Sequence, residues 1–207
     1  MIRGVRRLVH EHPGLSAFFV VYYAALVVYG VTTGAGQTHF YAVFVLIAAA
    51  VVASLYAGTR LSTLVLWGLA LWGLSHMVGG IVEVGGVTIY ERPTDTGEFR
   101  FDKVVHFFGF GFATLAAYEL LLRDESPAAS AKATAVTAAF VGLGIGAVNE
   151  TIEFLITRLP FESNVGGFSN TGWDLVANAT GAISASVVGY LRVGGEPGNR
   201  DTRSSSV

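Results

Sequence analysis

The sequence of 207 residues contains no cysteine, and only 14% of its residues are charged. Without cysteine the chain can form neither disulfide bonds nor thiolate metal sites. The formal net charge of −2 leaves no sizeable basic patch, which argues against a nucleic-acid partner. Soluble domains carry about a quarter charged residues, so this composition, with 52% hydrophobic residues, indicates a membrane protein.

The hydrophobic residues fall into six blocks of membrane-spanning length rather than into the stripes of amphipathic helices. We therefore expect an all-α fold, a polytopic bundle of about six transmembrane helices. The predicted spans are 15–31, 40–57, 61–82, 103–122, 131–157 and 173–191. They follow a short polar arm at 1–14 and precede a tail at 193–207 whose composition is typical of disorder.

A basic start followed by an apolar run is also typical of a secretory signal peptide. We favour an uncleaved first span, because the run is long for a signal and no clear small-x-small pattern follows it. With the N-terminus inside, nine of the 13 Lys and Arg residues fall on the inner side of six spans and four on the outer side. This bias predicts a multi-pass protein of the cell membrane with both termini in the cytoplasm.

Two connections between spans are long and polar, and both are expected on the outer side. The first, 82–102, contains Gly85-Gly86, which is compatible with a small hairpin or with a re-entrant segment. The second, 158–172, is rich in Gly, Asn and Ser and is read as a loop. Small residues also predict packing: a G-x-x-x-G pattern in the fifth span and a small residue every fourth position in the sixth favour close helix contacts. These positions are Gly142 and Gly146, then Ala177, Gly181, Ala185 and Gly189.

Polar residues gather at the outer ends of the last four predicted spans. Several pairs are three or four residues apart, so each pair lies on one face of its helix. Ionisable groups are costly in a bilayer, and such a cluster is therefore a hypothesis for a functional site. The residues are His76 and Glu83 at the outer end of the third span, Asp102, Lys103 and His106 at the start of the fourth, Asn149, Glu150 and Glu153 in the fifth, and Asp174 and Asn178 in the sixth.

These residue types suit two kinds of chemistry. Imidazole and carboxylate groups bind hard or borderline divalent metal ions, and the predicted ligands are Asp102, His106, Glu153 and Asp174. Carboxylates in a low-dielectric site also serve as general bases, a role predicted for Glu150 or Glu153 with His106 as the acid. The remaining predicted binding residues are Lys103, Asn178, Asn149 and His76. The alternative is a buried polar network that joins helices and binds nothing.

The same segments carry a family resemblance. His76-Met77-Val78-Gly79-Gly80, the stretch 101–107, the stretch 150–154 and the stretch 173–181 resemble the YjdF-type inner-membrane proteins and the related VanZ-like superfamily. The VanZ-like pattern is Asp-Lys-x-x-His, then Glu-x-x-Gln or Glu-x-x-Glu, then Asp-x-x-x-Asn-x-x-Gly. Its matches here are Asp102, Lys103 and His106, then Glu150 and Glu153, then Asp174, Asn178 and Gly181. Glu153 stands where many VanZ-like proteins have Gln.

This resemblance implies a small helical membrane protein associated with the cell envelope. One VanZ-like member is linked to glycopeptide-antibiotic resistance. The leading hypothesis is an outward-facing pocket that binds a divalent metal ion or a polar lipid or envelope headgroup, with interfacial hydrolysis or transfer as its catalytic form. The alternatives are a transporter or proton-coupled carrier and a non-catalytic membrane scaffold with a structural polar network, and the sequence leaves open whether the protein is an enzyme. Membrane lipids are the expected partners.

Overall fold

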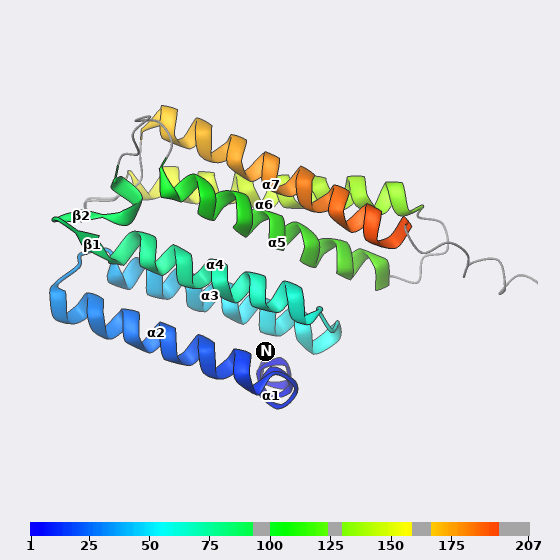
Figure 1. Cartoon of the computed structure of the whole chain (residues 1–207), viewed down its shortest axis with the longest axis horizontal. Helices are drawn as coiled ribbons and strands as arrows, with labels where there is room; N and C mark the ends of the chain where they lie inside the picture. Colours follow the sequence, from blue (N-terminus) through cyan, green and yellow to red (C-terminus); the bar gives the residue numbers. More distant parts are fainter. Residues whose placement is uncertain (93–99, 124–129, 159–166, 195–207) are drawn as a thin grey trace, which may run out of the picture.

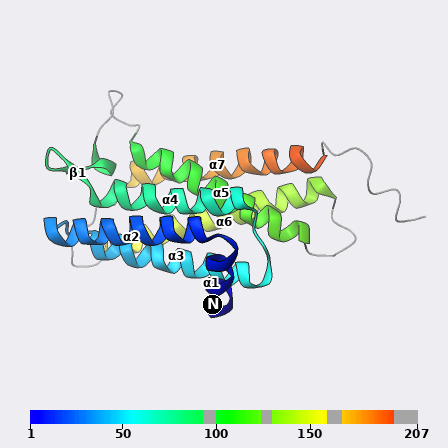
Figure 2. The same ribbon diagram turned by 60° about the horizontal axis from the view of Figure 1, so that its bottom comes forward.

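The computed structural model describes residues 1–92, 100–123, 130–158 and 167–194. Figure 1 shows helices α2 to α7 side by side along the long axis, with a small hairpin at one end and α1 near the other. In Figures 1 and 2, α1 runs across the direction of the other helices. The elements are α1 (Ile2–Glu11), α2 (Pro13–Thr33), α3 (Thr38–Gly58), α4 (Thr63–Ile81), β1 (Glu83–Val84), β2 (Val87–Thr88), the 3-10 helix η1 (Ile89–Glu91), α5 (Phe101–Arg123), α6 (Ala131–Ile156) and α7 (Phe168–Gly194).

Helices occupy all six stretches that the hydrophobic blocks predicted, which confirms the all-α membrane bundle. Five of them, α2 to α6, are long and apolar enough to cross a membrane. Among the described residues α7 is not in that group, although it is 27 residues long. Asp174, Asn178 and many small residues make it less apolar than its neighbours. Its role as a sixth span stays a prediction.

Local chemistry sets several helix boundaries. Pro13 opens α2, where its missing N–H costs no hydrogen bond. Ser62 and Ser130 cap α4 and α6, each accepting a hydrogen bond from a backbone N–H of the first turn. Gly34, at φ 72°, ends α2 in the left-handed conformation that glycine adopts without steric cost. Each cap satisfies groups that a helix end would otherwise leave without partners.

The long connection after α4 begins with a hairpin and not with a re-entrant segment. β1 and β2 pair antiparallel, with Glu83 opposite Thr88 and Val84 opposite Val87. The two linking residues, Gly85 and Gly86, have φ values of 68° and 80°, as a tight two-residue hairpin turn requires. Glu83 therefore lies exposed on a strand and not on the helical face of His76. Residues 93–99 of the same connection lie outside the described residues.

Three segment boundaries differ from the prediction. The polar arm is a helix, α1, because its basic and apolar residues alternate with helical period, a pattern typical of an amphipathic surface helix. The loop reading of 168–172 is wrong, since α7 starts at Phe168. Helix α7 also continues to Gly194, past the predicted start of the tail. The rest of that tail lies outside the described residues.

Helix α7 packs closely against α5 and α6, as its small residues predicted. A methyl group at Gly181 would collide with the backbone carbonyl of Phe107, so the α5 and α7 backbones nearly touch there. The G-x-x-x-G pattern of α6 has the same effect: Gly142 faces Thr114 of α5, and Gly146 faces Asn178 of α7. Close backbones bring short side chains from the three helices within hydrogen-bonding distance.

Candidate functional site

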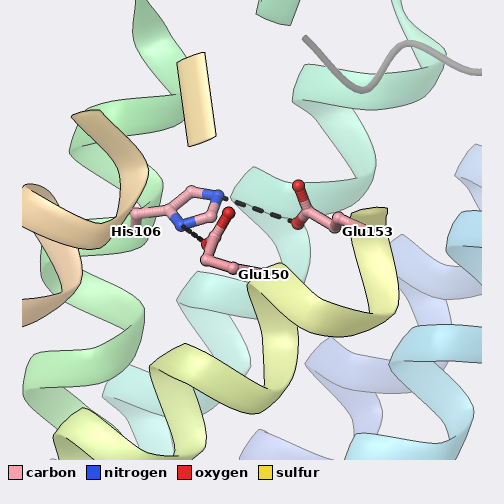
Figure 3. A group of neighbouring side chains, drawn as sticks. All are labelled: His106, Glu150 and Glu153. Carbon is pink, nitrogen blue, oxygen red and sulfur yellow. Dashed lines mark ion pairs between the residues drawn. The ribbon is translucent and has the colours of Figure 1, made fainter. Parts of the chain in front are cut away.

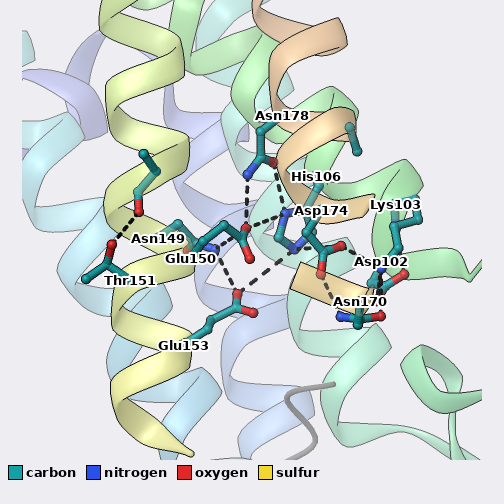
Figure 4. A network of polar contacts seen from close by, with 12 residues as sticks. Asp102, Lys103, His106, Asn149, Glu150, Thr151, Glu153, Asn170, Asp174 and Asn178 are labelled. Atoms are coloured by element: carbon teal, nitrogen blue, oxygen red, sulfur yellow. Dashed lines mark hydrogen bonds and ion pairs between the residues drawn. The ribbon is translucent and has the colours of Figure 1, made fainter. Parts of the chain in front are cut away.

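Nine polar residues of α5, α6 and α7 form a connected network at the hairpin end of the bundle (Figures 1 and 4). The start of α5, the last turns of α6 and the start of α7 lie together there, because α6 runs opposite to both neighbours in the bundle. His106 lies five residues, or about 8 Å, along α5 from its first residue. The network is therefore near one end of the helices and not at their midpoint.

Its centre is a triad of His106, Glu150 and Glu153, drawn in Figure 3. One ligand atom from each of the three lies within 4.8 Å of the others. His106 Nδ1 is 3.3 Å from Glu150 Oε1, and His106 Nε2 is 4.0 Å from Glu153 Oε1. The side chains of His106, Glu150 and Glu153 are 8%, 4% and 18% exposed. Glu153 is thus the member that solvent reaches most easily.

Asn178 of α7 fixes the orientation of the His106 ring. Its Nδ2 donates to Glu150 Oε1 at 3.0 Å, and its Oδ1 lies 2.9 Å from His106 Nδ1. An ionised carboxylate only accepts hydrogen bonds, so the Asn178 amide must turn its NH₂ toward Glu150 and its carbonyl toward His106. A carbonyl in turn needs a donor, which makes Nδ1 the protonated ring nitrogen. In neutral His106, Nε2 is then left with its lone pair.

The Nε2 atom of His106 faces carboxylates on two helices. His106 Nε2 is 3.9 Å from Asp174 Oδ1 and 4.0 Å from Glu153 Oε1. Asn149 donates to Glu153 Oε1 at 2.7 Å, which holds this carboxylate in place. The described contacts leave Glu150 Oε2, a buried atom, without a hydrogen-bond partner. With His106 neutral, the site thus contains an imidazole nitrogen with a lone pair beside a buried carboxylate oxygen that has no hydrogen-bond partner among the described residues.

Lys103 lies beside the triad and is buried. Its ammonium donates to Asp174 Oδ1 at 2.7 Å, to Asn170 Oδ1 at 2.8 Å and to Asp102 Oδ2 at 2.9 Å. The ammonium of Lys103 therefore lies inside the network and is not exposed at its surface. Asp102 Oδ1 also accepts from the Lys103 backbone N–H at 2.7 Å. Both Asp102 oxygens are consequently occupied by Lys103.

The sequence did not single out Asn170. Its Nδ2 donates to Asp174 Oδ2 at 2.6 Å, and its Oδ1 accepts from Lys103. Asn170 precedes Asp174 by four residues, the spacing that marked other pairs of the cluster. This spacing was not recognised because the last span was predicted to start at 173, after Asn170.

His76 lies apart from this network. It is buried among the rings of Tyr41, Phe44 and Trp72, and its Nδ1 is 2.9 Å from the hydroxyl of Tyr90. Burial raises the pKa of the Tyr90 hydroxyl well above its ordinary value, so Tyr90 stays neutral. His76 thus helps to join α4 to η1, and its predicted binding role has no direct contact with the triad to support it.

The charges of the network do not balance. Asp102, Glu150, Glu153 and Asp174 are four carboxylates, whereas Lys103 is the permanent cation among them and His106 can add one more. Buried charges are normally paired or coordinate metals. With all four carboxylates ionised, the one or two positive charges leave an excess of negative charge, which either a bound cation or protonation of a carboxyl group would neutralise.

Comparison with known protein families gives one match. The family model described as a predicted membrane protein (DUF2238) matches residues 14–195. The match begins in the first turn of α2 and extends past α7, so it includes every residue of the network. Comparisons with curated proteins and with solved structures found no match. The chain belongs to the DUF2238 family of predicted membrane proteins, the family of the YjdF-type proteins that its motifs resemble.

Proposed function

We propose that the protein binds one divalent metal ion at the triad of His106, Glu150 and Glu153. The observation that carries this proposal is Glu150 Oε2, a buried carboxylate oxygen that no described group satisfies. A buried polar atom without a partner costs about 1–3 kcal/mol, and more when it is charged. A metal ion removes that cost and offsets the excess negative charge of the network.

Distances support the same site. Protein nitrogen and oxygen ligands lie about 2.0–2.2 Å from an ion such as Zn²⁺. Two ligand atoms that share an ion are therefore at most about 4.4 Å apart when they lie on opposite sides of it, and about 3.4 Å apart in tetrahedral geometry. The 4.0 Å from His106 Nε2 to Glu153 Oε1 fits within the larger limit, and one Glu150 oxygen belongs to the same group of ligand atoms, all within 4.8 Å of one another.

Hydrogen bonds behind the triad resemble those of known metal sites. Ligating histidines commonly donate their other ring N–H to a fixed acceptor, which sets the tautomer and the ring orientation. Asn178 Oδ1 supplies that acceptor at 2.9 Å. Asn149 and Asn178 also bind the two glutamates, and the Lys103 ion pair holds Asp174 beside Nε2. Asp174 is thus a fourth candidate ligand, whereas Glu150 takes the place that the sequence assigned to Asp102.

One nitrogen and several oxygen ligands favour Zn²⁺, Mn²⁺ or Fe²⁺, because carboxylate suits Mn²⁺ and imidazole suits Zn²⁺ and Fe²⁺. The catalytic form of the proposal has Glu150 or Glu153 as the base and His106 as the acid or a ligand, acting on a polar lipid or envelope headgroup. The position of the network favours binding over transport, because carriers place their sites near the bilayer midplane. The bias of basic residues supports a site on the outer face of the cell membrane.

The order of the three motifs also supports a relationship to the VanZ-like superfamily and a role in the cell envelope. This part of the proposal rests on Asp102, Lys103 and His106 of α5, the two glutamates of α6 and Asp174 of α7 alone. A metal site shared by the two groups predicts that the same positions bind the ion in both.

Elemental mass spectrometry of detergent-purified protein, loaded with Zn²⁺ or Mn²⁺ and dialysed, tests the proposal. We expect about one metal ion per chain in the wild type and loss of the metal in Glu150→Gln and Glu153→Gln. Glu119→Gln is the matched control, because Glu119 lies on α5 at the opposite end and accepts a hydrogen bond from the backbone of Ser62. A metal-free wild type, or equal metal content in all four proteins, would overturn the proposal.

A further inference from the structure

The opposite end of the bundle contains a second feature, an apolar groove between α1, α2, α3 and α4. Its volume is about 300 Å³. Its walls include Val5 and Val9 of α1, Val20 of α2, Ala49 and Val52 of α3, and Leu69 of α4. The groove exists because small residues, Ala49 among them, line the wall where larger side chains would close the gap.

The groove opens toward the surface that faces lipid. Val5, Val9 and Val20 at its edge are 46%, 53% and 61% exposed. Along α3 its wall runs from Val45 to Ala53, which is about 12 Å of helix. One leaflet of the hydrocarbon core is about 15 Å thick. The groove is therefore long enough to hold much of one acyl chain of a single leaflet.

Helix α1 has two different exposed sides. One carries Ile2, Val5 and Val9, and the other carries the cationic Arg3 and Arg6. The opposite side of α1 packs on α3, where a methyl group at Gly4 would collide with the carbonyl of Ala53. A helix with separate apolar and basic faces that lies across the spans is typical of the membrane interface.

The cations of α1 divide into two groups. Arg7 pairs with Glu11 at 3.1 Å, and Arg60 pairs with the same carboxylate at 3.1 Å. Tyr56 also donates to Glu11 at 2.6 Å, so this end of α1 is held by α3 and by Arg60 after it. Within the described part of the chain, Arg3 and Arg6 form no ion pair. Their charge is available to a ligand from outside the chain.

From these observations we infer that an anionic phospholipid binds at this end of the bundle. Its acyl chain lies in the groove, and its phosphate lies near Arg3 and Arg6. The apolar walls match the chain, and the two unpaired arginines match the headgroup charge. This inference is independent of the metal site, because the two sites lie at opposite ends of the bundle.

Native mass spectrometry of delipidated protein, titrated with phosphatidylglycerol or phosphatidylcholine of equal chain length, tests the inference. We expect the wild type to bind one phosphatidylglycerol more tightly than phosphatidylcholine. Each arginine near an anionic lipid contributes a factor of about five, so Arg3→Gln/Arg6→Gln should reduce that preference about 25-fold.

Ala49→Trp fills the groove and should abolish binding of both lipids. Ala139→Trp is its control, because Ala139 is a partly exposed alanine of α6 outside the groove. Val20→Trp covers the edge from a position that is 61% exposed and gives the same readout if Ala49→Trp fails to fold. Unchanged lipid binding in a folded groove variant, an unchanged lipid preference in the double Gln variant, or a dimer that excludes lipid would overturn the inference.

Discussion

The buried ion pair of Lys103 gives the sharpest prediction about stability. Lys103→Met keeps most of the side-chain length and removes the charge. Asp102 and Asp174 then lose the cation that lies 2.9 Å and 2.7 Å from their oxygens, and both stay at positions with little solvent access. Breaking a buried ion pair by removing one partner costs about 3–5 kcal/mol, because the remaining charge is left without compensation.

The assay is equilibrium unfolding in detergent with a chelator present, followed by the fluorescence of the three tryptophans. We expect Lys103→Met to lower the free energy of unfolding by about 3–5 kcal/mol. Lys132→Met is the control, because Lys132 is the other lysine of the chain and is exposed on α6. Exposed substitutions of this kind change stability by no more than about 0.5 kcal/mol.

A double variant separates the charge effect from a packing effect. In Lys103→Met/Asp174→Asn a neutral amide replaces the uncompensated carboxylate at position 174, so we expect part of the lost stability to return. The coupling energy between two groups in contact is about 0.5–3 kcal/mol. Equal stability of Lys103→Met and Lys132→Met, or strict additivity in the double variant, would refute the electrostatic reasoning.

Three further predictions concern other parts of the chain. Acid should detach α1 from α3. Hydrogen bonds from Tyr56 and Arg7 and the charge of Arg60 hold the pKa of Glu11 below 4.5. The stability that Glu11 adds to the packing of α1 on α3 is therefore complete above pH 4.5 and is lost as the pH falls through the lowered pKa. A fluorophore on His10→Cys, a clean label in a chain without cysteine, should report this release, and Glu11→Gln should remove the pH dependence. Tyr22→Phe should raise the melting temperature, because the buried Tyr22 hydroxyl has no partner among the described residues and costs about 1–3 kcal/mol; a lower melting temperature would contradict this. Gly181→Leu should destabilise the bundle by about 1–3 kcal/mol or more through overpacking against Phe107, whereas Gly144→Leu, with open space at its Cα, should not.

Much of the fold could be predicted because a bilayer imposes one strong rule on sequence. A span must be about 20 apolar residues long, and the blocks from 15 to 157 obey that rule, so their helices appear where expected. The start of α7 was missed because Phe168–Gly172 is polar and rich in small residues, and its helical state depends on contacts such as Asn170 with Lys103. Hydropathy alone does not register such contacts.

The meeting of polar residues at one end was also predictable, since helix direction alternates along the chain. The individual pairings were not. The sequence placed Asp102 among the metal ligands and Lys103 among the other binding residues, yet Lys103 forms ion pairs with both Asp102 and Asp174. Which face of α5 turns inward depends on the close contact at Gly181, a tertiary feature that spacing within one helix cannot reveal.

The excess of negative charge in the network leads to different predictions for a metal-binding site and for a network that only joins helices. A purely structural network gains nothing from Glu150 Oε2, so removing that charge should be neutral or stabilising. Without metal we therefore expect Glu150→Gln to be at least as stable as the wild type. With metal at about 100 times its dissociation constant, the wild type should gain about 2.7 kcal/mol and become the more stable protein. Thermal unfolding of both proteins, with chelator and with metal, measures which of the two is more stable in each condition. If the same protein is the more stable one in both conditions, the network binds no metal.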